Sequence, residues 1–155
     1  MPKSFVSTGA IKIDDWCDVI TVANYGATAI NDMEILITDA TNMDITQGLV
    51  AVKTTTSADS VAVCGAAKGA IPAAVTDSMG NVIPGVGQMA CGGLSKVRVA
   101  YGSTFAVGAY LGTSTVAGEA ATGTQAVQTG LGKVAIAKTL TTAAYNWVYA
   151  WISLN

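Results

Sequence analysis

The chain has 155 residues, enough for one compact domain, and only 12% of them are charged, with a net charge of −2. This balance excludes the basic surface of a nucleic-acid-binding protein. The absence of histidine excludes Ser-His-Asp and Cys-His catalysis and any metal site built on histidine. Cys17, Cys64 and Cys91 form no CxxC pair, so we expect buried thiols in a reducing compartment.

The beginning of the chain is expected to be an extended arm followed by a single β-domain. Residues 1–10 carry one charged side chain, Lys3, and lack the continuous apolar segment of a signal peptide, so we expect synthesis in a cytosol. The domain is expected to span residues 11–155. At its start, residues 14–26 favour either a short helix near 14–22, capped by Asp14, or a strand that begins near Val19.

Most of the remaining chain has the pattern of short strands. Stretches with period-two alternation or β-branched side chains lie at 33–39, 48–56, 60–65, 96–101 and 132–139. Turn signals separate them at 78–81, 91–93, 101–103 and 117–119. Short strands with regular turns predict an all-β fold. We expect a compact β-barrel or sandwich, similar to a β-tulip or a jelly roll, with at most one or two short helices.

The segment from residue 74 to residue 93 is predicted to be a hairpin or a long loop. Pro72 and Pro84 disfavour a central strand, because proline cannot donate a hydrogen bond to a neighbouring strand. Residues 85–93, GVGQMACGG, have the glycines of a phosphate-binding loop but lack its Lys-Ser/Thr ending and its following helix. We therefore expect a β-turn there.

Two further patterns support neither a metal site nor a membrane span. Residues 39–44, DATNMD, have the acidic spacing of a calcium loop without its central glycine and terminal glutamate, so an Asx-type turn explains them better. Residues 99–118 are uncharged but are interrupted by glycines and rich in Ser and Thr, which argues against a spanning helix. With no catalytic motif, we expect no enzymatic activity, cofactor, metal, nucleic acid or membrane.

The last strand is apolar on both faces. Trp147, Tyr149 and Trp151 lie on one face, and Val148, Ala150, Ile152 and Leu154 lie on the other. A strand of this kind must be covered on both sides. The second cover comes either from the chain itself or from a neighbouring subunit, because Trp and Tyr are favoured at interfaces. We predict interface contacts for Phe5, Val6, Trp147, Tyr149 and Trp151.

The C-terminal part of the chain resembles small bacteriophage capsid decoration (cement) proteins. The shared features are a VG-x-x-L strand entry, a turn closing with GxA, a glycine followed by VAIA-like alternation, a small-residue linker and a final hydrophobic strand. In this chain they correspond to Val107-Gly108 with Leu111, Gly118 with Ala120, Gly132 to Ala137, Thr141 to Ala144, and Trp147 to Leu154. The resemblance covers about the last 65 residues. The segment 65–93 is longer, and the last strand more aromatic, than the family pattern.

The resemblance implies a virion structural protein that binds the outer surface of a phage capsid as a homotrimer and stabilises the shell. Its partners would be the major capsid protein and its own copies, and it would be made in the host cytoplasm. Two alternatives stay open. One is another phage structural protein, such as a tail protein or a head-fibre base, and the other is a carbohydrate-binding β-sandwich with Trp147 or Trp151 as a platform. As a sugar platform, the indole of Trp147 or Trp151 would be solvent-exposed, whereas as an anchor in a protein interface it would be buried.

Overall fold

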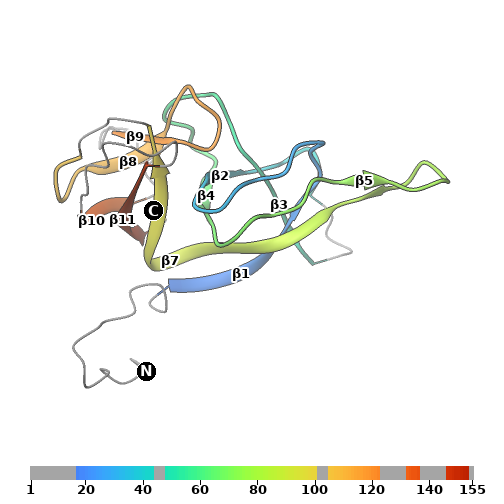
Figure 1. Cartoon of the computed structure of the whole chain (residues 1–155), viewed down its shortest axis with the longest axis horizontal. Coiled ribbons are helices and arrows are strands. Elements are labelled where there is room, and N and C mark those ends of the chain that lie inside the picture. The colour runs from blue at the N-terminus through green and yellow to red at the C-terminus, as the bar shows by residue number, and fades with distance from the viewer. Residues whose placement is uncertain (1–16, 44–47, 101–104, 123–131, 137–145, 154–155) are drawn as a thin grey trace, which may run out of the picture.

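The computed structural model describes residues 17–43, 48–100, 105–122, 132–136 and 146–153. The regular secondary structure of these residues consists of β-strands. Residues 1–10, the expected arm, lie outside this part, as does the predicted boundary at residue 11. Figure 1 shows the strands gathered along the long strand β7. They are β1 (Cys17–Asn24), β2 (Ile35–Thr38), β3 (Val50–Lys53), β4 (Val63–Ala67), β5 (Val75–Thr76), β6 (Val82–Ile83), β7 (Gly85–Val99), β8 (Tyr110–Thr113), β9 (Ala120–Thr122), β10 (Gly132–Ile136) and β11 (Asn146–Ser153).

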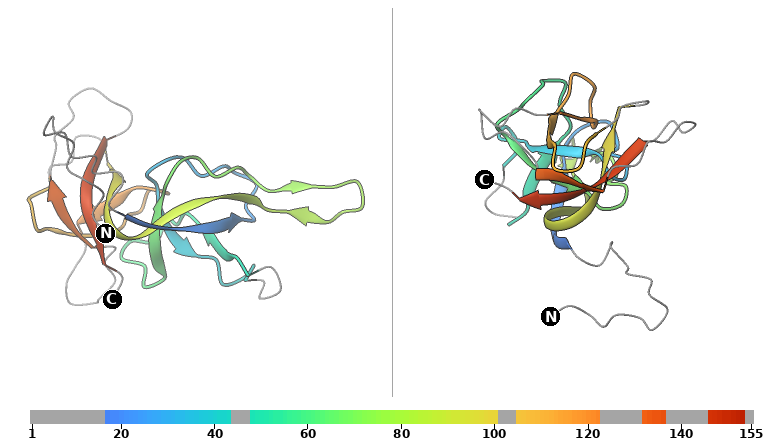
Figure 2. Two further views of the ribbon diagram at one scale, coloured as in Figure 1. Left: turned by 90° about the horizontal axis from the view of Figure 1, so that it is seen from below. Right: turned by 90° about the vertical axis from the view of Figure 1, so that its left-hand side faces the viewer.

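Two closed rings of strands share β7, which confirms the predicted all-β class of compact barrel or sandwich. The first ring has the order β1-β3-β2-β4-β7 and closes because β1 also pairs with β7. The second ring has the order β7-β11-β10-β8-β9 and closes through one parallel pair, Val99 with Ala120. Figure 2 shows the two groups of strands at different ends of β7. Closure leaves few unpaired strand edges, which stabilises a small β-domain.

The length of β7 corrects the turn predicted at residues 91–93. The strand runs without a break from Gly85 to Val99, pairing first with β1 and then with β11. Gly93 has a φ of 79°, and the register of β1 against β7 shifts between Asp18 and Val19. Glycine therefore bends the strand where it changes partners instead of ending it, as at a β-bulge. The β-turn expected within residues 85–93 is wrong for the same reason.

The helix considered for residues 14–22 is also wrong over its described part. Residues 17–24 form β1, which pairs antiparallel with β7 over its whole length and parallel with β3. The run Val19-Ile20-Thr21-Val22 is β-branched throughout, and such side chains lose rotamer freedom in a helix and fit a pleated strand. The alternative of a strand in this segment is confirmed.

Two apolar cores lie on opposite faces of the central strands β2, β4 and β7. Ile35, Ala66 and Ala90 belong to the core that also contains Val97, Leu111 and Val148. Their neighbours in sequence, Leu36, Ala67 and Met89, belong to the core with Val22, Val52 and Ile71. The alternating residues of these three strands are therefore buried on both sides, so each strand contributes to both cores. Burying a side chain such as Leu36 fully contributes about 1.5–3 kcal/mol.

A partly buried ion cluster joins the two rings. Arg98 on β7 bonds Glu34, just before β2, at 2.6 Å from Nη1, and Glu119, just before β9, at 3.0 Å from Nη2. The Glu34 carboxylate also accepts hydrogen bonds from the backbone and side-chain nitrogens of Asn31. Gly118 has a φ of 77°, and a Cβ there would lie 2.7 Å from Cγ of Glu34. The cluster is therefore closely packed as well as charged.

Candidate interaction surface

The aromatic face of β11 consists of Trp147, Tyr149 and Trp151. The opposite face of the strand is buried as expected, with Val148, Ala150 and Ile152 in the core. Trp147 and Tyr149 are half-buried, and Trp151 is 50% exposed. The described residues therefore do not fully cover this face, although the sequence pattern requires cover on both sides. Leu154, Phe5 and Val6 lie outside the described residues.

Lys96 organises part of the aromatic face. It lies directly opposite Tyr149 in the register of β7 and β11. Its Nζ is 4.9 Å from the ring centroid of Trp147 and 5.8 Å from that of Tyr149. The two rings meet edge to face with centroids 5.0 Å apart. Such contacts contribute about 0.5–1 kcal/mol for an exposed cation–π pair and about 0.5–1.5 kcal/mol for the ring pair.

These contacts bear on the two roles considered for the tryptophans. Lys96 lies over one ring face of Trp147, so that indole is not a fully open stacking platform. Trp151 is 50% exposed, and it is the more open of the two. The aromatic face is thus intermediate between the buried anchor and the open sugar platform.

The β5–β6 hairpin is a second exposed apolar element. It extends beyond the barrels at one end of the long axis of the molecule (Figures 1 and 2). Val75, Met79, Val82 and Ile83 are all exposed, and Met79 is 82% exposed. In the register of the hairpin Val75 lies opposite Ile83 and Thr76 opposite Val82, so each of its two faces carries an apolar side chain. The sequence predicted a hairpin or a long loop in this segment, and it did not predict the exposure of these side chains.

The tip of the hairpin is held by one carboxylate. Oδ1 of Asp77 accepts hydrogen bonds from the backbone nitrogens of Met79 and Asn81, each at 2.8 Å, and Oδ2 accepts one from Nδ2 of Asn81 at 3.0 Å. The side-chain bond from Asn81, together with the backbone bonds, lowers the pKa of Asp77 below its ordinary value. The turn predicted at residues 78–81 is confirmed, and it is an Asx-type turn.

The base of the hairpin is fixed to the body. The backbone nitrogen of Ala74 donates to the carbonyl oxygen of Gly26 at 2.9 Å, and Nδ2 of Asn24 donates to the carbonyl oxygen of Pro72 at 2.9 Å. A Cβ at Gly85 would collide with that same carbonyl oxygen, so the chain can approach this closely only with glycine. The hairpin is therefore a preorganised projection at both its base and its tip.

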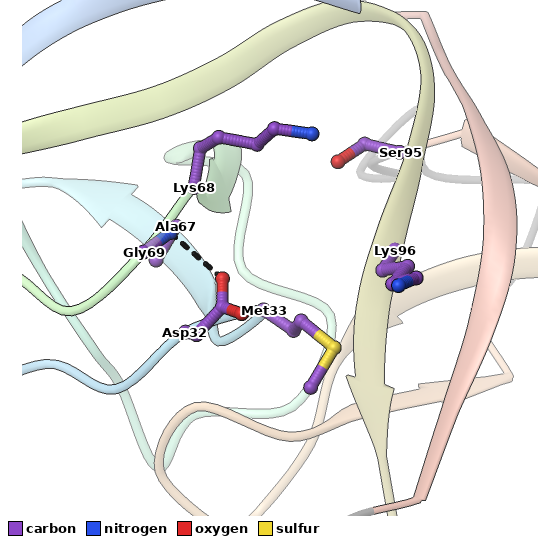
Figure 3. A pocket seen from close by; sticks show the side chains of 7 residues that line it. All are labelled: Asp32, Met33, Ala67, Lys68, Gly69, Ser95 and Lys96. Carbon is purple, nitrogen blue, oxygen red and sulfur yellow. Dashed lines mark hydrogen bonds between the residues drawn. The ribbon is translucent and has the colours of Figure 1, made fainter. Parts of the chain in front are cut away.

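A cleft of about 260 Å³ lies between β7 and the Asp32–Met33 turn (Figure 3). Its lining residues are Asp32, Met33, Ala67, Lys68, Gly69, Ser95 and Lys96. Oδ1 of Asp32 accepts a hydrogen bond from the backbone nitrogen of Gly69 at 2.7 Å. The cleft holds two lysines against one aspartate, and it is smaller than the range of about 300–1,000 Å³ typical of small-molecule pockets.

Met33 is held at this cleft in a rare backbone conformation. Its φ is 66°, which is uncommon for a residue other than glycine. The backbone nitrogen of Met33 donates to Ala67 at 3.0 Å, and its carbonyl oxygen accepts from the backbone nitrogen of Arg98 at 2.7 Å. Such strained residues persist where their surroundings fix them, and they are enriched at ligand contacts and other functional sites.

The acidic segment that begins at Asp39 forms an Asx-type turn, as predicted. The Asp39 carboxylate accepts hydrogen bonds from the backbone of Thr41, from Nδ2 of Asn42 and from Nζ of Lys53. Burial opposes ionisation of Asp39, but the bonds from Asn42 and Lys53 and the charge of Lys53 outweigh it and lower the pKa. Asp44 lies outside the described residues. Among the residues that the structure describes, no three acidic or cysteine side chains are grouped to hold a metal.

Within the described part of the chain, no helix is long and apolar enough to cross a membrane. No family model matches the sequence, and no curated protein matches it. The fold is similar to a solved structure, that of the head fiber gp8.5 N base in bacteriophage phi29. The two share a TM-score of 0.56 at 14% identity, over 88% of this chain and 95% of that chain. At this identity the likeness establishes a shared fold, and it does not confirm the capsid decoration family.

Proposed function

We propose that this chain is a structural protein of a phage virion that binds the outer surface of the capsid as a homotrimer. The observation that carries the proposal is the fold likeness to a phage head fiber base, which extends over nearly all of both chains. The sequence resemblance to decoration proteins supports the same class of function independently. Both kinds of protein act by contact rather than by chemistry, so the proposal includes no enzymatic activity.

The surface of the molecule supports a contact role. The β5–β6 hairpin and the aromatic face of β11 both present apolar side chains to solvent. Large exposed apolar side chains that gather on one element mark interaction sites in soluble proteins. The major capsid protein and further copies of this chain are the proposed partners. The proposed location is therefore the virion, on the capsid surface.

A head-fibre base and a cement protein would both bind the shell, but they differ in effect. A cement protein bridges capsid subunits and raises the temperature at which the shell opens. A base attaches a fibre and need not stabilise the shell. The head fiber neighbour favours the base, and the motif resemblance favours cement.

Co-sedimentation with purified capsids tests the proposal. Full-length protein should pellet with undecorated or expanded capsids at a saturable stoichiometry, whereas it should stay in the supernatant without them. Heating the complex then separates the two roles, because only a cement protein delays shell opening. Failure to bind any form of the capsid would overturn the proposal.

Carbohydrate binding is a second candidate function, favoured by one observation. Trp151 is half-exposed on a strand whose opposite face is buried, as a sugar-stacking indole would be. Quenching of tryptophan fluorescence by a panel of oligosaccharides tests it. A Trp151→Ala variant must lose the signal if that ring is the platform.

A further inference from the structure

The cleft between β7 and the Asp32–Met33 turn contains a buried hydroxyl group. Ser95 is 2% exposed and lines the cleft, and Figure 3 shows its Oγ pointing into the cavity. Within the described part of the chain, this oxygen takes part in no hydrogen bond. Buried hydroxyl groups are normally hydrogen-bonded, because an unpaired one loses its bonds to water without replacement. The partner of Ser95 must therefore enter the cleft from outside, as water or as part of a ligand.

The other side of the cleft presents a carboxylate oxygen. Oδ1 of Asp32 accepts a hydrogen bond from the backbone nitrogen of Gly69 at 2.7 Å, and no described residue donates to its Oδ2. The bond to Gly69 holds the carboxylate in place at the edge of the cleft. The hydroxyl of Ser95 can donate or accept a hydrogen bond, whereas the carboxylate of Asp32 only accepts. A ligand that satisfies both groups must therefore carry at least one hydrogen-bond donor.

The charges of the lining favour a neutral ligand. Nζ of Lys96 already lies over the rings of Trp147 and Tyr149. Lys68 also has an interaction of its own, so neither amine is set aside to bind an anion. Both amines nevertheless repel a cation that would approach Asp32. A neutral molecule with several hydroxyl groups meets all of these conditions.

The size and the walls of the cleft suit one sugar ring. The volume of about 260 Å³ lies below the range of about 300–1,000 Å³ typical of pockets for drug-sized ligands, so the ligand must be small. Met33 and Ala67 supply an apolar wall for the C–H face of a sugar, while Ser95 and Asp32 are available to its hydroxyl groups. Two backbone hydrogen bonds hold Met33 at a φ of 66°, and such strain is enriched at ligand contacts.

We propose that this cleft binds one neutral sugar ring, with one sugar hydroxyl bonded to Oγ of Ser95 and another donating to Oδ2 of Asp32. The inference deepens the carbohydrate-binding candidate and rests on it, and it does not depend on capsid binding. Lys96 lines the cleft and also lies over Trp147, so the cleft adjoins the aromatic face of β11. A longer glycan would extend from the cleft toward that face.

The first test titrates the isotope-labelled full chain with glucose, galactose, mannose and N-acetylglucosamine and follows the backbone resonances by NMR. For a ligand of about 12 heavy atoms, we expect a dissociation constant on the order of 1 mM for at least one of these sugars. The resonances of Met33, Gly69 and Ser95 should shift, whereas that of Val61, which is exposed elsewhere, should not.

Inorganic phosphate and methylammonium are the charged comparison probes of this titration. Neither ion should shift the resonances of the cleft. If no sugar shifts them at about 50 mM, well above the expected dissociation constant, the inference is wrong. It is equally wrong if phosphate or methylammonium binds in the cleft and the sugars do not.

The second test removes the two groups that would bind the sugar. Ser95→Ala deletes a hydroxyl that has no bond to lose, so thermal stability should not fall, while the dissociation constant of the sugar should rise about ten-fold or more. Asp32→Asn keeps an oxygen for the bond to Gly69 but replaces Oδ2 with a donor, and it should also weaken binding. Ser78→Ala removes an exposed hydroxyl from the hairpin and is the matched control. Wild-type sugar affinity in both cleft variants would overturn the proposal.

The outcomes separate this inference from the functions proposed above. If a sugar shifts the indole resonances of Trp147 and Trp151 but not the cleft, and Trp151→Ala abolishes the effect, carbohydrate binding stands and the cleft inference is wrong. If the cleft binds a sugar but the chain does not pellet with capsids, the inference holds and the capsid proposal fails. If the chain pellets with capsids and binds no sugar, the inference and the carbohydrate candidate fail together.

Discussion

The central strands and the β5–β6 hairpin show two outcomes of the same apolar pattern. In β2, β4 and the middle of β7, neighbouring residues such as Ile35 and Leu36 are buried in opposite cores. In the hairpin, Val75 and Val82 on opposite faces are both exposed. The difference is that two rings of strands enclose the central strands, whereas the hairpin leaves the body. An apolar pattern therefore indicates that a strand face needs to be covered, but it does not indicate which molecule covers it.

The ion cluster keeps the two rings together, so its loss should have the largest effect. Replacing Arg98 with Ala leaves the buried Glu34 and the partly buried Glu119 without their cation, and breaking a buried pair in this way costs about 3–5 kcal/mol. Chemical denaturation followed by circular dichroism measures the loss. Lys96→Ala, on the same face of β7, is the control and should cost much less. Equal losses in the two variants would contradict a special role for the cluster.

Truncating a side chain in the central strands, which are buried on both faces, should destabilise the fold nearly as much. Leu36 is fully buried among residues of the first ring, and Leu36→Ala should lower the free energy of unfolding by about 2–5 kcal/mol. Ile37→Val removes one methylene group from the next residue and should cost about 0.5–1.5 kcal/mol. Urea titration of both proteins gives the comparison. If the two losses are the same, Leu36 does not have the packing described here.

Stability should also depend on the charge of Asp39. Its pKa in the folded chain is below the ordinary value of 3.8, so the carboxylate stabilises the fold above pH 4 or so, and this contribution is lost as the pH falls through the folded pKa. Asp39→Asn should therefore be less stable than wild type at pH 7, and the difference should shrink below pH 4. A difference that stays constant between pH 7 and pH 2.5 would rule out this linkage. Thermal melts across this range measure it.

The smallest effect on the single chain is expected in the hairpin. Ile83→Ala should change the free energy of unfolding by no more than about 0.5 kcal/mol in dilute solution, since the side chain is already exposed. The measurement must be made at protein concentrations low enough to prevent association. A loss comparable to that of Leu36→Ala would mean that the body covers the hairpin after all.

The strand pattern of the chain could be predicted from sequence because alternation and β-branched residues determine local structure. The strands at Ile35–Thr38, Val50–Lys53 and Gly132–Ile136 fall within the predicted stretches. Apart from the helix considered for residues 14–22, the errors lie where glycine allows two structures. Gly92 and Gly93 were interpreted as a turn but lie in β7, because glycine also permits the bend of a strand that changes partners.

The candidate surface was predicted only in part. The apolar pattern of Trp147, Tyr149 and Trp151 identified the strand, but not the position of Lys96 over the rings. That position depends on the register between β7 and β11, which pairs residues some 50 positions apart in sequence. The exposure of Met79 was missed for a similar reason, because it depends on where the hairpin leaves the barrel. The scarcity of charge between Pro72 and Gly93 was the available signal.

Hydrogen–deuterium exchange of residues 75–83 tests most directly whether another molecule covers the hairpin. We expect fast exchange in dilute solution, where the chain is a monomer, and slower exchange when the protein is concentrated enough to associate. Residues 50–53 of β3, which are part of a closed ring, serve as the internal reference and should exchange slowly in both conditions. Exchange of residues 75–83 that is the same in dilute protein, concentrated protein and the capsid-bound state would contradict the account.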